Sequence, residues 1–363
     1  MRRQPKQGGQ EARHAPQYSE RKDRTIRDSW GRGFVTSPLR DEAGWIRLLS
    51  TTWHRKDAEV GLGDDGCVIP PARYTLSTDV LVEGVDFRPD WAPPEALGYK
   101  AMAANLSDLA AMGAFPRFFL MTLGFPRGYP ETFVEGVLRG LHALSDRCGV
   151  ELCGGDLTRA PGGLFVSLTV IGEQRRRPLL RSGGRPGDAL YLSGPLGGPA
   201  EALRRLEAGA RLEVFDPAAG PDDPERALLD RFYRPPDQIP LGLFLADSGV
   251  ASCCMDVSDG LARDLSRICE ASACGAELLA DALPVDPLLS RLGEKERLQR
   301  ALEGGEEQIL LFAVPPERER TLEGSGVKLY RVGRLTEGEE RVLVMPDGRR
   351  EPIREAGYDH FVP

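Results

Sequence analysis

Short acidic clusters recur beside apolar segments of this 363-residue chain, and they limit how the chain can fold. A carboxylate next to a buried segment is costly unless a cation or a hydrogen-bond donor partners it. One such cluster alone is typical of a turn or a helix cap. Several together favour a shared partner, a group of Mg²⁺ ions, because magnesium prefers oxygen ligands. The clusters are Gly61-Leu-Gly-Asp-Asp-Gly66, Ser77-Thr-Asp79, Asn105-Leu-Ser-Asp108, Gly154-Gly-Asp156 and Asp256-Val-Ser-Asp-Gly260.

The first cluster matches the dinucleotide pattern G-x-G-x-x-G, but its context argues against a Rossmann turn. Cys67-Val-Ile69 continues as a strand where a Rossmann turn would begin a helix, and the two aspartates would repel a diphosphate. The P-loop pattern G-x-x-x-x-G-K-[ST] is also absent from the chain. We therefore expect any nucleotide phosphate to be bound through a cation.

Apolar runs with strand and helix periodicity follow one another in two stretches, which predicts a two-domain protein of the α/β (α+β) class. Residues 1–40 are polar, lack apolar periodicity and are predicted to be a disordered extension. Residues 41–175 form the first predicted domain, with a long helix from Pro94 to Ala114. Residues 176–363 form the second, an α/β domain.

Composition excludes several classes of function. The net charge is −8, with 47 basic and 55 acidic residues, so bulk attraction to nucleic acid is not expected. Seven cysteines without a C-x-x-C pair, and only four histidines, indicate neither a disulfide framework nor a zinc site. No apolar run approaches the roughly 18 residues of a membrane span, and no signal-peptide core is present. We expect a cytoplasmic protein without a membrane partner.

Seven segments resemble, in order, those of thiamine-monophosphate kinases, and the resemblance extends over residues 41–363. Two of them are shared with the wider superfamily of aminoimidazole ribonucleotide synthetase, selenophosphate synthetase and a hydrogenase maturation factor. The last is narrower and favours the thiamine enzymes. The segments are Gly61-Leu-Gly-Asp-Asp65, Ser77-Thr-Asp-Val-Leu-Val-Glu-Gly-Val85, Leu97 to Ala114, Gly154-Gly-Asp156, Arg181-Ser-Gly183, Asp256-Val-Ser-Asp-Gly-Leu261 and Gly357-Tyr-Asp-His-Phe361.

The resemblance implies a role for each matching residue. It also implies a homodimer whose N-terminal mixed sheets join in a barrel, with residues 41–175 binding ATP and magnesium. No side chain is expected to act as a catalytic acid, base or nucleophile. The implied magnesium ligands are Asp65, Ser77, Thr78, Asp79, Asp108, Asp156 and Asp256, with Asp259 on a further ion; Gly155, Asp156, Arg181 and Ser258 would contact ATP, and Asp86, Glu306 and Phe361 the thiamine monophosphate.

The chain departs from the family pattern on the acceptor side. Asp86 stands where the family usually has His, and Gln238 where an Arg is common. Gly304-Gly-Glu-Glu-Gln-Ile-Leu310 keeps Glu306 but lacks the family's aromatic residue and second acid.

The function predicted from the resemblance is ATP-dependent phosphorylation of thiamine monophosphate to thiamine diphosphate by direct in-line transfer. Two alternatives stay open: a sibling enzyme with another acceptor, and a non-catalytic sensor of nucleotide or thiamine phosphate. A sibling is disfavoured because the reactive cysteines of selenophosphate synthetase and of the hydrogenase factor have no counterpart.

Overall fold

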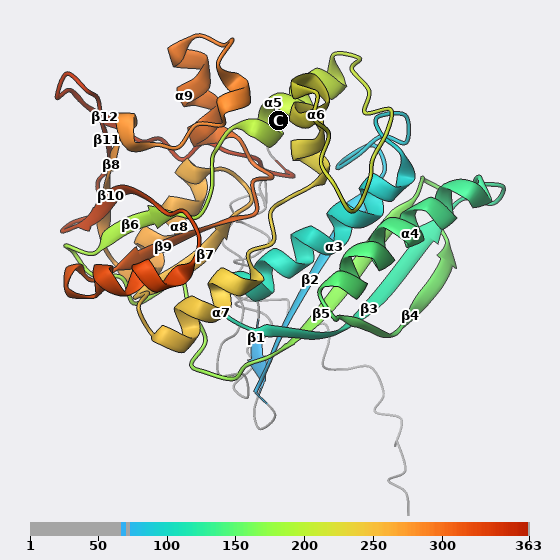
Figure 1. The fold of residues 1–363 in the computed structure, drawn as a ribbon, viewed down its shortest axis with the longest axis horizontal. Coiled ribbons are helices and arrows are strands. Elements are labelled where there is room, and N and C mark those ends of the chain that lie inside the picture. The colour runs from blue at the N-terminus through green and yellow to red at the C-terminus, as the bar shows by residue number, and fades with distance from the viewer. Residues whose placement is uncertain (1–66, 70–72, 362–363) are drawn as a thin grey trace, which may run out of the picture. The chain divides into compact units, whose positions relative to one another are not determined.

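The computed structural model describes residues 67–69 and 73–361, which build two β-sheets flanked by helices (Figure 1). The first sheet has five strands in the order β1-β2-β5-β3-β4, and the second has seven in the order β12-β11-β8-β10-β6-β9-β7. The predicted mixed α/β class is thereby confirmed. The extension predicted for residues 1–40 and the cluster Gly61–Gly66 lie outside the described residues.

The first sheet is mixed and is covered by helices on one face. β5 pairs antiparallel with β2 and β3, whereas β4 runs parallel to β3. Alternate residues of β5 are buried, as expected for a strand with one face on a core. Helices α3 and α4 pack over this face (Figure 1). The elements are β1 (Cys67–Ile69), β2 (Tyr74–Val82), α3 (Pro94–Ala111), β3 (Phe115–Phe125), α4 (Glu131–Arg147), β4 (Glu151–Arg159) and β5 (Phe165–Glu173).

Helix α3 is buried around nearly its whole circumference, because small residues let its neighbours come close. A Cβ atom on Gly98 would lie 1.8 Å from the Val137 carbonyl oxygen, and one on Gly140 of α4 would lie 1.8 Å from that of Glu95. α3 also contacts β7 and α7 of the C-terminal half. It therefore joins the two sheets.

The second sheet is mostly antiparallel, with β11 parallel to β8. Helices α6 and α9 are not predicted from the sequence pattern. The elements are β6 (Ala189–Leu192), α5 (Gly198–Glu207), α6 (Pro224–Tyr233), α7 (Ile239–Ser248), β7 (Cys253–Val257), α8 (Leu261–Ser272), β8 (Gly275–Leu279), α9 (Glu294–Glu303), β9 (Ile309–Val314), β10 (Tyr330–Thr336), β11 (Arg341–Val344) and β12 (Arg350–Pro352).

The predicted domain boundary at residues 175–176 falls between β5 and β6. The division into separate domains stays a prediction. None of the described helices is long and apolar enough to cross a lipid bilayer.

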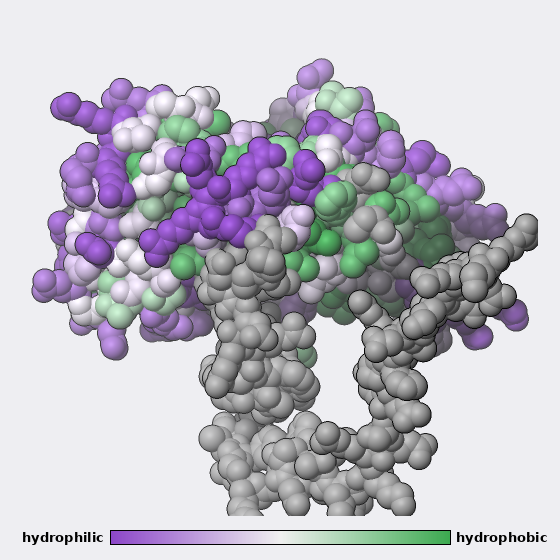
Figure 2. Space-filling model, turned by 90° about the horizontal axis from the view of Figure 1, so that it is seen from below, coloured by the Kyte–Doolittle hydropathy of each residue, from purple (hydrophilic) through white to green (hydrophobic). Residues whose placement is uncertain are grey.

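The first sheet leaves apolar side chains exposed. Val80 of β2 is 42% exposed and Leu120 of β3 is 39% exposed, and both point away from α3. Green, hydrophobic residues gather on the right-hand part of the face in Figure 2, the side of the molecule on which the first sheet lies. We call the face of the first sheet opposite α3 the outer face. Exposed apolar area of this kind often marks an interaction surface.

Candidate active site

Two hydrogen bonds between a serine hydroxyl and a carboxylate connect helix α3 to its neighbours. Ser77 of β2 donates to Asp108 Oδ2 at 2.5 Å, and Ser107 of α3 donates to Asp256 Oδ2 of β7 at 2.7 Å. One contact ties α3 to the first sheet and the other ties it to the second. Three acidic clusters that are far apart in the sequence, at positions 77–79, 105–108 and 256–260, are thereby brought together.

Asp79 lies on the same face of β2 as Ser77, the face that α3 covers. The pKa of Asp79 is raised to about 6, mainly by burial and also by the carboxylates of Glu306 and Asp86, against the opposing effects of the Val80 amide and Lys100. Asp79 nevertheless keeps exposed surface. Its carboxyl group is thus crowded by protein and by other acids, yet remains accessible to a ligand.

The oxygen donors of this region fit magnesium. Among the described residues, no group of three or more His, Cys, Asp or Glu side chains forms a ready-made metal site. Mg²⁺ commonly takes only one or two carboxylates and completes its shell with waters and substrate phosphates. Asp79, Asp108 and Asp256 suit that requirement. The remaining predicted ligand of the N-terminal cluster, Asp65, lies outside the described residues.

Thr78 and Asp156 point to the opposite side of the first sheet. Asp156 pairs with Thr122 of β3, and the same row continues through Ser167 to the exposed Val80. Side chains in one row share a face of the sheet. The described residues of one chain therefore place Thr78 and Asp156 on the outer face, apart from the carboxylates that gather at α3.

Gly155 is required by strand packing. Its φ is +151°, and a Cβ atom there would lie 1.8 Å from the Met121 carbonyl oxygen of β3. The close approach is to the neighbouring strand of the same chain, which explains this glycine without a nucleotide.

Asp264 organises the loop Asp256–Gly260, and sequence reasoning missed it. Its Oδ2 accepts hydrogen bonds from the amides of Ser258, Asp259 and Gly260 at 3.0, 3.1 and 3.2 Å. Burial, and then the Asp259 carboxylate, raise the pKa of Asp264 to about 7, against the opposing effect of Arg267. The signal in the sequence was an aspartate four residues after Gly260, in the first turn of α8.

Arg267 borders the same loop, and Arg181 lies near Arg267. Arg267 Nη2 lies 2.6 Å from Asp259 Oδ2, so the carboxylate predicted to bind a further magnesium ion already has a cationic partner. Arg181, predicted to contact ATP, is partly buried and accepts a hydrogen bond on its backbone oxygen from Ser272 of α8 at 3.0 Å. Arg181 is also near enough to Arg267 to affect its pKa. These positive charges suit a phosphate chain.

Glu306 lies in a strained segment just before β9. Its Oε1 is 2.8 Å from Lys100 Nζ of α3, and its Oε2 accepts a hydrogen bond from Gln308 Nε2 at 3.2 Å. Glu306 and Gln308 have φ values of +69° and +46°, unusual for residues other than glycine. The Glu306 amide donates to the Ser258 carbonyl at 2.7 Å, which joins this segment to the loop Asp256–Gly260.

Asp86 is engaged with its own loop. Its Oδ2 accepts a hydrogen bond from the Val82 amide at 2.7 Å. Burial is the main cause that raises the pKa of Asp86; Glu306 raises it further, while His360 and Lys100 lower it. Asp86 and Glu306, predicted to contact one substrate, are therefore close enough to interact.

The C-terminal segment is fastened to α8 and to the loop before it. Tyr358 donates its amide hydrogen to the Asp259 carbonyl at 3.0 Å, and Arg263 pairs with Asp359 at 2.5 Å. The Phe361 amide in turn donates to Asp359 Oδ1 at 2.9 Å. These contacts fix the backbone near Phe361, whose side chain is 51% exposed.

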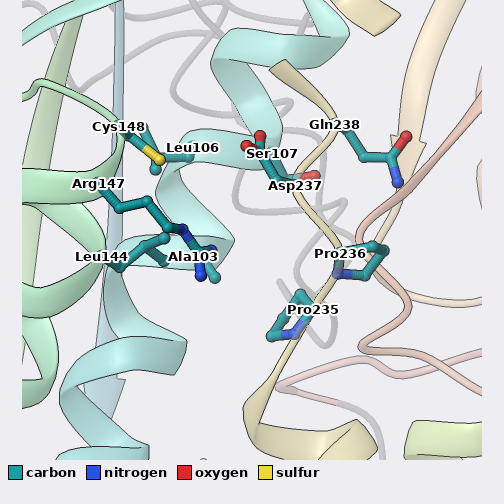
Figure 3. Close-up of a pocket in the computed structure, with 10 residues that line it drawn as sticks. All are labelled: Ala103, Leu106, Ser107, Leu144, Arg147, Cys148, Pro235, Pro236, Asp237 and Gln238. Atoms are coloured by element: carbon teal, nitrogen blue, oxygen red, sulfur yellow. The ribbon is translucent and has the colours of Figure 1, made fainter. Parts of the chain in front are cut away.

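A small cavity lies beside Ser107, between α3, α4 and residues 235–238 (Figure 3). Its volume is about 10 Å³, which is room for roughly one water molecule. Gln238, one of the departures noted in the sequence, lines it together with Arg147, Cys148 and Asp237. This cavity is too small for a nucleotide.

Two family models match the chain. The AIR synthase related protein, N-terminal domain, matches residues 63–174, and the AIR synthase related protein, C-terminal domain, matches residues 185–345. Together they define the class of two-domain proteins to which the fold corresponds.

Curated relatives narrow this class. The chain is 38% identical to the thiamine-monophosphate kinase of Salmonella typhimurium, covering 85% of this chain and 93% of that protein. It is 31% identical to that of Bacillus subtilis, covering 88% and 99% respectively. The chain belongs to the thiamine-monophosphate kinase family, which confirms the resemblance seen in its motifs.

Solved structures agree. A chain described as "AaThiL complexed with AMPPCP and TMP" is 30% identical, with a TM-score of 0.77, covering 90% of this chain and 99% of that one. The thiamine-monophosphate kinase of Stenotrophomonas maltophilia is 33% identical, with a TM-score of 0.68, covering 85% and 96%.

Replacing Asp264 should destabilise the protein. Asp264→Ala leaves three loop amides without their acceptor and removes one of the two carboxylate partners of Arg267, so the free energy of unfolding should fall by about 2–4 kcal/mol. Urea unfolding measures the change, and Asp281→Ala, at an exposed aspartate, is the matched control. Equal midpoints for Asp264→Ala and wild type would show that Asp264 does not support the loop.

Proposed function

We propose that the chain transfers the γ-phosphoryl group of ATP to thiamine monophosphate, yielding thiamine diphosphate and ADP. The main support is the 38% identity to a named thiamine-monophosphate kinase over 85% of the chain. The site agrees with this, since the Ser77–Asp108 and Ser107–Asp256 hydrogen bonds gather acidic oxygens beside a loop bordered by Arg267. An acid cluster next to cationic side chains is what a phosphoryl-transfer site requires.

The proposed reaction is a direct in-line displacement. A phosphate oxygen of thiamine monophosphate forms a bond to the γ-phosphorus as the bond from that phosphorus to the β–γ bridging oxygen breaks, and ADP leaves. The attacking oxygen is already anionic, so no general base is needed. The obstacle is repulsion, since two unit charges 4 Å apart repel by about 4 kcal/mol at an effective dielectric constant near 20.

We assign the magnesium ligands to the face of the first sheet that α3 covers. Magnesium, when bound, supplies neutralisation of the phosphate charges and alignment of the two reactants. Asp79, Asp108 and Asp256 would hold it. The hydroxyl of Ser77 and the carboxylate of Asp65, from neighbouring motifs of the sequence, would be further ligands. Asp259 would join a further ion only by giving up its Arg267 partner.

We place ATP and the acceptor on two sides of the loop Asp256–Gly260. Ser258 and Arg181 would contact the ATP phosphates. Glu306, Asp86 and Phe361 would face thiamine monophosphate. The exposed ring of Phe361 offers a π surface to the cationic thiazolium, a contact worth about 0.5–2 kcal/mol.

We also propose that two copies of the chain associate through the outer face. The exposed apolar side chains of β2 and β3 would be buried there. Thr78 lies on β2, and Gly155 and Asp156 lie on β4, two strands of this sheet. If these residues bind ATP or magnesium, they do so at the interface between two copies. Association would thus complete the predicted ligand set.

The free thiols support a reducing compartment, and we propose the cytoplasm. Disulfides form in oxidising compartments and are rare in the cytosol. All cysteines in the part of the chain for which pairing is described are free: Cys148, Cys253, Cys254, Cys269 and Cys274.

Asp108→Asn should abolish the reaction. The substitution keeps the size of the side chain and removes the charge that faces the proposed magnesium, so turnover should fall by at least about 100-fold while the fold is retained. Product formation from ATP, Mg²⁺ and thiamine monophosphate is the measurement, with Asp281→Asn as the control. Normal turnover in both Asp108→Asn and Asp79→Asn would refute the metal-mediated mechanism.

We expect the wild type to be active. Asp86→His should then increase the affinity for the acceptor, thiamine monophosphate. Removing a negative charge near the acceptor phosphate should lower the KM for thiamine monophosphate by roughly fivefold, equivalent to about 1 kcal/mol. Asp86→Asn is the matched control, because it can still accept the Val82 hydrogen bond without a charge. Product from the variant but none from wild type would instead support the sensor or sibling interpretation.

Leu120→Glu should prevent association of two copies. A carboxylate in the centre of the outer face would be buried without a partner, and that cost opposes dimerisation. Sedimentation equilibrium should show two-chain mass for wild type and one-chain mass for the variant, with Leu138→Glu on α4 as a similarly exposed control. A wild type of one-chain mass would contradict the dimer.

A further inference from the structure

Lys100 is a buried cation at the junction of the two halves of the chain. Lys100 lies on α3, and the exposed fraction of the residue is 0%. The ammonium nitrogen lies 2.8 Å from Glu306 Oε1 and 3.2 Å from the ring centroid of Phe232 on α6. A lysine is rarely buried so fully unless it is paired, and here both partners come from the C-terminal half.

Lys100 and Ser107 lie on one side of α3. They are seven residues apart, which is about two helical turns, so their side chains project in nearly the same direction and are separated by roughly 10 Å along the axis. Ser107 holds Asp256 and Lys100 holds Glu306. One rigid helix thus fixes the distance between two segments of the C-terminal half, the one that contains Asp256 and the one that contains Glu306.

Glu306 depends on these contacts for its position. Its backbone is in the left-handed region, at φ +69°, where a residue other than glycine is strained. One carboxylate oxygen meets Lys100 and the other accepts from Gln308. The side chain is still 29% exposed. The Glu306 carboxylate is therefore positioned by Lys100 and Gln308 and is still accessible to a ligand.

We infer that Lys100 is a positioning residue of the acceptor site, which holds Glu306 at a fixed distance along α3 from the Ser107–Asp256 contact. This inference rests on the proposed function, because it assigns Glu306 to the acceptor. In the proposed function the phosphoryl donor is bound near Asp256 and the acceptor near Glu306, so the spacing between Ser107 and Lys100 would set the spacing between the two substrates. Lys100 itself touches neither substrate.

The experiment compares Lys100→Met, Glu306→Gln and the double variant. Lys100→Met leaves Glu306 as an unpaired charge, so the acceptor KM should rise roughly tenfold while the KM for ATP changes less than twofold, and the melting temperature should fall. The double variant has no unpaired charge and should recover the melting temperature. Its acceptor KM should stay high, because nothing then holds a carboxylate toward the acceptor.

A matched control is Glu277→Gln, which breaks the ion pairs to Arg334 and Arg350 at the other side of the second sheet. It should change stability without changing the ratio of the two KM values. Recovery of both stability and acceptor KM in the double variant would overturn the inference, as would a parallel rise of both KM values in Lys100→Met or a changed ratio in Glu277→Gln. A wild type that forms no thiamine diphosphate would overturn the proposed function, and the inference with it.

Discussion

The structure depends on a helix that is buried from all sides and must still carry polar groups. Helix α3 packs against α4 through glycines, covers the first sheet, and reaches the second sheet with Ser107 and Lys100. Three of its polar side chains have partners on other elements: Ser107 on β7, Asp108 on β2, and Lys100 in the segment before β9. Satisfying these atoms therefore fixes the two halves of the chain against each other and assembles the candidate site at the same time.

The cost of gathering carboxylates explains much of the local chemistry. Asp264 is stabilised by three amides and Arg267, and Asp259 shares that arginine. For Asp79, burial outweighs the opposing effect of the Lys100 cation, and the pKa of Asp79 is raised to about 6. An acid held in such a position favours any cation that can reach it. The structural carboxylates are thus already paired, while Asp79 keeps the accessibility that the proposed magnesium site requires.

Two residues that depart from the family pattern, Asp86 and Gln308, have hydrogen-bond partners within the protein. Asp86 accepts a hydrogen bond from the Val82 amide, and Gln308 donates one to Glu306. Both residues replace family residues of different chemistry, but each has a local partner and strengthens a loop or a side-chain position. These departures are therefore compatible with membership of the thiamine-monophosphate kinase family.

The sequence by itself determined the class of fold, most of the strands and the motifs that carry the acids, because apolar periodicity and glycine spacing are local properties. It did not reveal α6, whose start depends on Asp223 capping the Arg226 amide after a proline-rich loop. Only the tertiary structure decided that Ser77 and Asp79 face α3 while Thr78 and Asp156 face outward, since pairing register determines which face a side chain shares with its neighbours. Only the tertiary structure showed that Lys100 is buried, because the sequence of a helix does not tell whether a lysine is exposed to water or buried against a carboxylate.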